Sequence, residues 1–180
     1  MNNEEYVLPS ALGDSPTVLE FRDLALKYCA LIESHRELTR LKFLKACLDL
    51  LPDLYKKALV LPRFEPTREC LPERSITHDE WADFFWSIRD RLGKYDSYTE
   101  VFDPIFPEED DPTQSSLADD LADIYRDLKN GLIYWDMVSP TRYEDAVWEW
   151  SFNFASHWGQ HLTSALRAIH FLVFDHLGEE

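Results

Sequence analysis

The chain has 180 residues, which suits a single domain, and its 45% hydrophobic and 14% aromatic content favours a packed core over a disordered chain. Its formal net charge of −16 would repel the phosphates of nucleic acids and anionic membrane surfaces, so we expect no nucleic acid and no membrane as a partner. The sequence also contains no run of 18 apolar residues that could cross a bilayer.

The first third of the chain predicts two long helices after a flexible lead-in at residues 1–14. Ser15 or Thr17 can cap a helix whose apolar residues recur at helical spacing to about residue 35, and Thr17 with Glu20 makes a capping box. A second helix is expected over about 37–60. Pro52 should kink this helix or split it in two, because proline removes a backbone donor and clashes with the preceding turn.

A loop, a third helix and a second loop follow. Three prolines without any clear period predict a loop over about 61–76. Thr77 then begins a capping box ahead of a helix over 78–92. The next connection, about 94–115, is long for a compact domain, and its acidic run at 108–111 is expected to be exposed.

The last third predicts two more helices. The first begins after a cap at Ser116 and ends near residue 136. The second, about 141–176, is apolar over most of its circumference, which predicts the central helix of the fold. No segment reads as a convincing strand. The predicted fold is therefore all-α, with one domain over 15–177: an up-and-down helical bundle of four main helices plus one additional or split helix.

The three cysteines include no CxxC pair and indicate no disulfide framework. Cys29 and Cys47 lie in apolar helical stretches, where we expect them to pack as small hydrophobic residues. The first ten residues have neither the basic residues nor the apolar run of a signal peptide. A cytoplasmic protein is expected.

The segment HWGQH, residues 157–161, is the first candidate site. His157 and His161 are four residues apart, so on a helix their Cβ atoms would lie roughly 5–6 Å apart and both imidazoles could bind one zinc, iron or manganese ion. Asp120 or Asp127 of the preceding helix could be a further ligand. Asp123, His170, Asp175 and His176 are other candidates. The pair equally fits the edge of a packed face, in which case no cofactor is expected.

A second candidate is the acidic flank of the fourth predicted helix. Asp120, Asp123 and Asp127 are spaced i, i+3 and i+7 and so share one side. If they faced Glu144 or Glu149 across a cleft, they could hold the ion of a divalent-cation-dependent nucleotide hydrolase. Acidic residues near a helix N-terminus also stabilise the helix dipole, which is a sufficient local reason for them.

A third interpretation is a protein-interaction module. No GxSxG motif or glycine-rich phosphate loop is present, which favours a protein that is not an enzyme. Ten acidic and no basic residues lie between Lys94 and Arg126, and Trp148, Trp150 and Phe152 cannot all pack against one neighbour. The leading hypothesis is a non-enzymatic acidic module that binds a protein partner or forms a homodimer. The metal-binding bundle and the nucleotide hydrolase are the alternatives.

Four segments in this order resemble one bacterial family of small, stand-alone helical domains of unknown function. They are FRDLALKYCALIE, LDLLPDLYKKALVLP, SLADDLADIYRDLKNGL and HWGQHLTSALRAIH. The resemblance extends from about Ser15 to Phe174. It implies a helical bundle in the bacterial cytoplasm, and it implies no activity and no catalytic residue.

Overall fold

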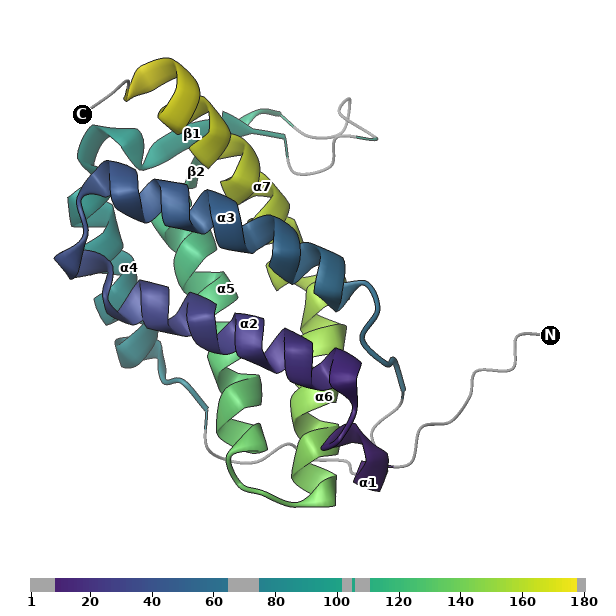
Figure 1. Cartoon of the computed structure of the whole chain (residues 1–180). Coiled ribbons are helices and arrows are strands. Elements are labelled where there is room, and N and C mark those ends of the chain that lie inside the picture. The colour runs from purple at the N-terminus through teal and green to yellow at the C-terminus, as the bar shows by residue number, and fades with distance from the viewer. Residues whose placement is uncertain (1–8, 65–74, 102–104, 106–110, 178–180) are drawn as a thin grey trace.

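The computed structural model describes residues 9–64, 75–101, 105 and 111–177, and the protein is mostly helical (Figure 1). The acidic run at 108–110, most of the predicted loop at 61–76 and Cys70 lie outside the described residues. The helices are α1 Pro9–Leu12, α2 Pro16–Glu33, α3 Arg40–Ala58, α4 His78–Leu92, α5 Leu117–Trp135, α6 Pro140–Ser156 and α7 Trp158–Phe171, and a short π-helical turn follows at Leu172–His176.

Helix α5 is at the centre of the fold. It contacts α2, α4, α6 and α7, and 15 of its 19 residues are buried. In Figure 1, α2 and α3 lie side by side as one layer across α5, α6 and α7. The prediction that the last helix would be central is therefore wrong: α6 leaves Phe152 and Ala155 exposed and α7 leaves a polar side exposed, whereas α5 is covered on nearly all sides.

Most helix starts follow the predicted capping residues. Ser15 is at the N-cap position of α2, and Pro16 occupies its first turn. The capping box of α4 is formed, because the Thr77 side chain accepts from the Glu80 backbone while the Glu80 side chain accepts from the Thr77 backbone. Ser116 caps α5 through the Asp119 backbone N–H. Helix α3 continues through Pro52, so the predicted split does not occur.

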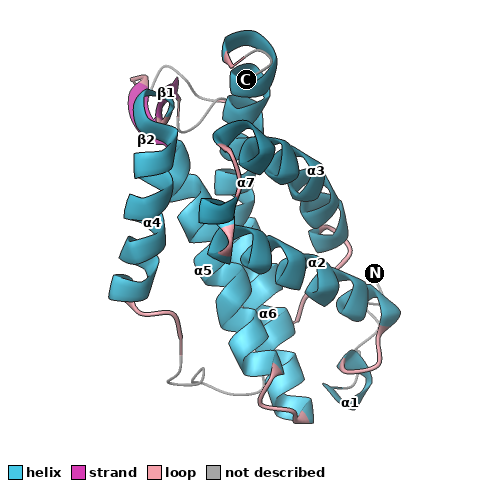
Figure 2. Ribbon diagram, turned by 60° about the vertical axis from the view of Figure 1, so that its left-hand side comes forward, coloured by secondary structure: helices cyan, strands magenta, loops and turns pink. Residues whose placement is uncertain are grey.

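A short antiparallel ladder corrects the strict all-α expectation. Strand β1, Ser97–Glu100, pairs with β2, Thr113–Ser116, and both lie within the connection that was predicted to be a loop. The ladder lies at the C-terminal end of α4 (Figure 2). The strands are only four residues long, and half of their residues are exposed while the other half are partly buried. They carry no apolar alternation that a sequence pattern could reveal.

The last predicted helix is broken. Helix α6 ends at Ser156, α7 begins at Trp158, and His157 between them has φ −147° and ψ −86°, outside the helical region. Gly159 makes the break possible, because a Cβ at this position would lie 2.2 Å from the Phe154 carbonyl oxygen. Gly159 thus serves close packing at the junction between the two helices.

The core is built around two tryptophans whose polar atoms are satisfied. Trp150 and Trp158 are fully buried, and Phe21 packs against both. The Trp150 indole N–H donates to the Leu128 carbonyl at 3.0 Å, and that of Trp158 donates to the Trp150 carbonyl at 3.0 Å. A buried indole needs such an acceptor. The Trp150 bond therefore fixes the position of α6 along α5, and the Trp158 bond joins α7 to α6.

The remaining structural expectations concern the N-terminus, the cysteines and the membrane. Within the expected lead-in, residues 9–12 form α1, which contacts α6 and buries Leu12. Cys29 and Cys47 are buried free thiols, and burial raises the pKa of both, as expected for small core residues. In the described ranges, none of the helices combines the length and apolar character needed to span a bilayer.

Candidate metal centre

Three aspartates of α5 face two histidines at the junction of α6 and α7. Asp120, Asp123 and Asp127 occupy one flank of α5 and are all buried. His157 lies in the break itself and His161 in the first turns of α7. Because α5 packs against both α6 and α7, the two sets of side chains meet directly, and the two imidazole rings are 4.7 Å apart.

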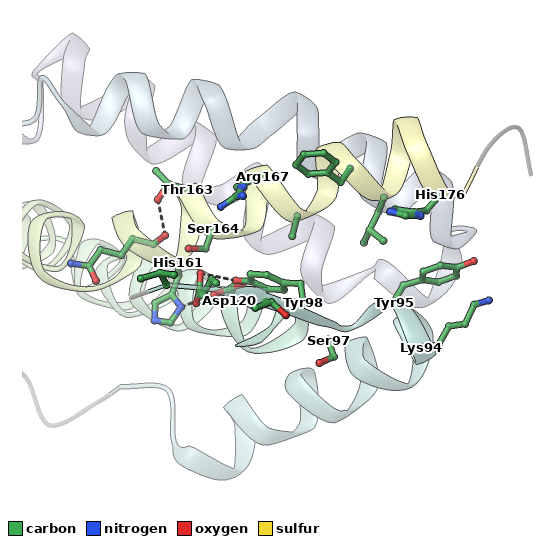
Figure 3. Close-up of a pocket in the computed structure, with 17 residues that line it drawn as sticks. Lys94, Tyr95, Ser97, Tyr98, Asp120, His161, Thr163, Ser164, Arg167 and His176 are labelled. Atoms are coloured by element: carbon green, nitrogen blue, oxygen red, sulfur yellow. Dashed lines mark hydrogen bonds and ion pairs between the residues drawn. The ribbon is translucent and has the colours of Figure 1, made fainter. Parts of the chain in front are cut away.

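The outer nitrogen of each imidazole is held by its own aspartate. His157 Nδ1 lies 2.7 Å from Asp127 Oδ2, and His161 Nδ1 lies 2.9 Å from Asp120 Oδ1. The second oxygen of Asp120 accepts from the Tyr98 hydroxyl at 2.6 Å, which completes the hydrogen-bonded chain drawn in Figure 3. An ionised carboxylate can only accept, so each Nδ1 carries the proton that it donates.

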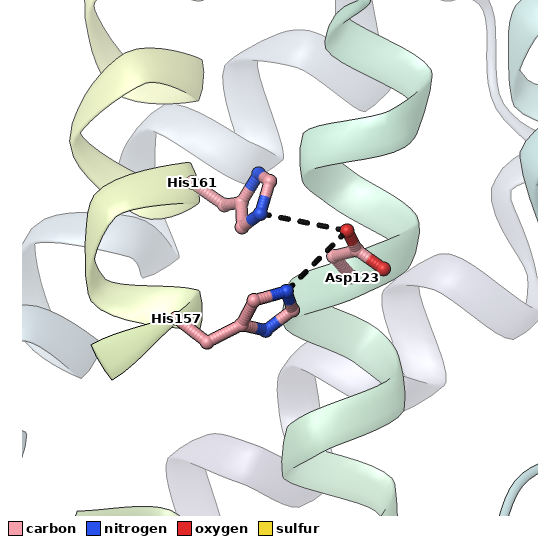
Figure 4. A group of neighbouring side chains, drawn as sticks. All are labelled: Asp123, His157 and His161. Carbon is pink, nitrogen blue, oxygen red and sulfur yellow. Dashed lines mark ion pairs between the residues drawn. The ribbon is translucent and has the colours of Figure 1, made fainter. Parts of the chain in front are cut away.

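The inner nitrogens of both rings are directed at Asp123 (Figure 4). Asp123 Oδ2 lies 3.7 Å from His157 Nε2 and 3.5 Å from His161 Nε2. The three ligand atoms that Asp123, His157 and His161 can offer all lie within 4.8 Å of one another. These Asp123 distances exceed the usual 2.7–3.2 Å of an N–H···O hydrogen bond. The cluster therefore holds its polar atoms close together without bonding them to each other.

Arg126 occupies the other side of Asp123. Its Nη2 lies 2.7 Å from Asp123 Oδ1, and its Nε lies 3.9 Å from Asp127 Oδ1. The guanidinium also lies over the Trp81 ring of α4, at 5.8 Å. Arg126 thus orients the carboxylate so that only Oδ2 is presented to the two histidines.

The electrostatic environment of His161 favours its positively charged form. Burial alone would lower the pKa of His161, but the hydrogen bond to Asp120 and the charges of nearby aspartates outweigh this cost and raise the pKa. For Asp120, burial raises the pKa, and the hydrogen bonds from His161 and Tyr98 oppose that change. With side-chain exposures of 35% for His157 and 25% for His161, the cluster is reachable from solvent.

The β1–β2 ladder fixes the position of Tyr98. Asp96, just before β1, accepts from the Ala118 backbone N–H at 2.8 Å and from the Ser116 hydroxyl, and thereby ties the ladder to the first turn of α5. This attachment brings Tyr98 to Asp120, 22 residues further along the chain. No pattern in the sequence pointed to Tyr98, because its role depends on strand pairing within a predicted loop.

The structure thus brings His157 and His161 together, with Asp123 between their inner nitrogens. Asp120 and Asp127, which were expected as ligands, instead bind the outer nitrogens. The other candidates lie elsewhere: His170 packs on Phe171 and Phe174, and His176 lies near the opposite end of α7. The one clue to Asp123 in the sequence was its place between the other two aspartates on the flank.

Glu149 has a different environment from the one expected. It was considered as a residue that could face the aspartates across a cleft, but it is only 6% exposed. Burial, together with the charge of Asp127, raises its pKa to about 7, although hydrogen bonds with Asn130 and Asn153 act in the opposite direction. A buried carboxyl group therefore lies directly behind the cluster.

The fold and the cluster define a mostly helical protein in which an aspartate-bearing central helix faces a pair of histidines. The chain belongs to the family described as Domain of unknown function (DUF5063), whose family model matches residues 14–175. This finding confirms the resemblance that the four sequence segments indicated.

Among solved structures, the chain is similar to protein BF1032 from Bacteroides fragilis, a structural genomics target. The two share 26% identity and a TM-score of 0.79, over 91% of this chain and 96% of that one. The comparison with curated proteins finds no match. Neither similarity assigns an activity.

Proposed function

We propose that this protein binds a divalent metal ion, zinc or iron(II), through Asp123 Oδ2, His157 Nε2 and His161 Nε2. The observation that carries the proposal is the orientation of both rings by Asp127 and Asp120. Histidines that bind metals characteristically donate their other ring nitrogen to a carboxylate, which sets the tautomer and makes the free nitrogen a better ligand. Here the same arrangement occurs twice, on both rings of one cluster.

The distances from Asp123 Oδ2 to the two Nε2 atoms fit ligands of a shared ion better than direct hydrogen bonds between these atoms. Two ligands bonded at about 2.0–2.1 Å to a tetrahedral ion lie roughly 3.3 Å apart. The 3.5 and 3.7 Å between Asp123 Oδ2 and the two nitrogens are close to this value. Without an ion between them, Asp123 Oδ2 and the two Nε2 atoms lie beyond hydrogen-bonding distance of one another.

The donor set indicates the kind of ion and what it could do. Two imidazoles and one carboxylate suit zinc, and the same set binds iron(II) in non-haem sites with open positions. Three protein ligands leave room for a water molecule, whose pKa a zinc ion lowers to about 7. A centre of this kind would supply a metal-bound hydroxide, which favours a metal-dependent enzyme over a purely structural site.

The test is metal content. Protein purified without an affinity tag or chelator should contain close to one equivalent of zinc or iron by elemental analysis. Asp123→Asn and the double variant His157→Ala/His161→Ala should lose it. His170→Ala is the matched control, because His170 is an exposed histidine of the same helix outside the cluster. If the wild type does not take up zinc or iron(II) after dialysis against either ion, the proposal is wrong.

A homodimer is a second candidate function, supported by one surface feature. On α6, Phe152 is 52% exposed and stacks on Trp148 with ring centroids 4.8 Å apart. An aromatic pair with one exposed and one partly buried ring is typical of interface anchors. Sedimentation velocity should then give a dimer for the wild type and a monomer for Phe152→Ser. A monomeric wild type at high concentration would argue against this candidate.

The nucleotide-hydrolase hypothesis has less support. It needs Asp120 and Asp127 free to bind an ion opposite Glu144 or Glu149. Instead, Asp120 and Asp127 are engaged by His161 and His157, and the large cavity beside Asp120 is lined by neither glutamate. We therefore favour the histidine-based centre.

A further inference from the structure

A cavity of about 920 Å³ opens beside the candidate metal centre, between α7 and the segment 94–101. This volume is in the range of small-molecule binding sites. Figure 3 shows His161, Asp120 and Tyr98 at one end and Tyr95, Lys94 and His176 at the other. From His161 to Phe171 the cavity follows ten residues of helix, or roughly 15 Å at 1.5 Å per residue. Its shape suits an elongated ligand.

The end next to the metal centre is polar, and its acidic groups are already engaged. Asp120 accepts from His161 and Tyr98, and Glu100 accepts from the Ser115 hydroxyl at 2.6 Å. Both carboxylates of this end thus already accept hydrogen bonds from groups of the protein.

The other half of the cavity combines an apolar wall with a cation. Ala168, Phe171 and Leu172 lie on one face of α7 and its continuation, and Tyr95 lies opposite them. Arg167 lies beside this wall, and no carboxylate in the described part of the chain forms an ion pair with it. In a protein with a net charge of −16, an exposed arginine that lines this cavity without such a partner is available for a ligand.

We propose that this cavity binds an elongated organic anion, with its carboxylate or phosphate group on Arg167 and its apolar part against Ala168, Phe171 and Leu172. A guanidinium binds such groups through charge-assisted, often bidentate hydrogen bonds. The apolar wall adds the hydrophobic contribution expected of a small-molecule site. The inference goes beyond the metal centre and does not require an ion to be bound there.

The experiment is isothermal titration calorimetry of the metal-free full-length protein with decanoate, decyl phosphate and decyltrimethylammonium. At least one of the two anions should bind with a stoichiometry near one, and the tighter of them identifies the preferred head group. The cation has the same chain and the opposite charge, and it should bind at least tenfold more weakly. Saturation by the cation with equal affinity, or no saturable binding of either anion, would overturn the proposal.

Two variants and one control locate the ligand. Arg167→Gln should weaken anion binding at least tenfold, since it removes the charge while Arg167 lies at an exposed position that tolerates the change. Ala168→Phe should fill the apolar half and abolish binding. Lys27→Gln removes an exposed positive charge from α2 and should have no effect. Equal affinities for Arg167→Gln and Lys27→Gln would contradict the assignment.

The same titration with zinc-loaded protein separates this inference from the proposed function. A protein that binds the anion but no zinc would refute the metal centre and leave the anion site standing. A protein that binds zinc but neither anion would refute the anion site and leave the metal centre standing.

Discussion

Asp123 differs from Asp120 and Asp127 in what each carboxylate contacts. The outer two each hold the Nδ1 of one histidine at 2.7–2.9 Å, whereas Asp123 is paired with Arg126 and only approaches the two Nε2 atoms. Three identical side chains on one flank thus have two different roles. The difference arises because the histidines come from a helix junction, where their rings point between the aspartates.

Replacing Asp127 with Asn tests the orienting role. The amide keeps the size of the side chain but removes the charge that holds the Nδ1 proton of His157. Loss of such a partner commonly weakens metal binding about 10–100-fold, and we expect this range for zinc. Competition with a chelating dye measures it, with Asp136→Asn, an exposed aspartate at the end of α5, as the control. Unchanged zinc affinity would show that the contact between Asp127 and His157 Nδ1 does not contribute to zinc binding.

Glu149 predicts a pH dependence of stability. Its pKa rises from an ordinary 4.5 to about 7 in the folded protein. The folded state therefore keeps a proton that the unfolded state releases, so this group's contribution to stability falls as the pH rises from 4.5 to 7 and stays low above it. Glu149→Gln cannot ionise and should escape that loss.

The size of the effect follows from the shift. We compare the free energy of unfolding of Glu149→Gln with that of the wild type at each pH. This difference should favour the variant by about 2 kcal/mol more at pH 8 than at pH 5. Urea unfolding of both proteins at the two pH values measures the difference. A constant difference between the proteins at pH 5 and pH 8 would mean that Glu149 has an ordinary pKa.

At the scale of elements, the contact between α5 and α6 is decided by a glycine and a tryptophan. A Cβ on Gly131 would lie 2.1 Å from Trp150 Nε1, so only glycine lets the indole pack flat against α5 and reach the Leu128 carbonyl. The histidine-bearing junction follows directly from α6. The packing of one tryptophan thus helps to set where His157 and His161 lie relative to the aspartates.

Gly131→Ala should therefore destabilise the protein, although alanine is the better helix former. Forcing a methyl group into this contact should cost about 1–3 kcal/mol, whereas the gain in helix propensity is roughly 1 kcal/mol. At a separation of 2.1 Å we expect a cost in the upper part of that range, and therefore a net loss of about 2 kcal/mol in urea unfolding. Ala30→Gly, the reverse exchange at an exposed site of α2, should lose about 1 kcal/mol through propensity alone. A stabilised Gly131→Ala protein would contradict the packing argument.

At the scale of the molecule, the cluster joins two segments that are separated along the chain. The aspartates belong to α5, and the histidines belong to the junction of α6 and α7, both of which pack against α5. A metal ion bound between them would bridge α5 and α7, and it would also reduce the net charge of −16. Binding only in the folded state makes the ion a stabiliser of the whole fold.

Zinc should accordingly raise the melting temperature. At free zinc about 100-fold above its dissociation constant, the stabilisation is about 2.7 kcal/mol, which corresponds to roughly 5–10 °C for a chain of this size. Differential scanning calorimetry with and without zinc measures it, and His157→Ala/His161→Ala should show no such rise. An equal rise in that variant would place zinc on the acidic surface instead of in the cluster.

Several features of this protein were determined by the sequence alone. The helix starts at Thr77 and Ser116 depend on bonds within one turn, and the family is indicated by short segments in order. The pairing of His157 with His161 is also local, since the two are four residues apart. Local interactions leave a direct trace in neighbouring residues, so these features could be predicted.

Only the tertiary structure decided the rest, because the deciding contacts join residues far apart in the chain. The β1–β2 ladder depends on pairing between exposed four-residue segments, and Tyr98 meets Asp120 only through it. Which aspartate faces the inner nitrogens depends on how α5 lies against α6 and α7. The i, i+3, i+7 spacing of three aspartates along one helix flank contains no information about that rotation.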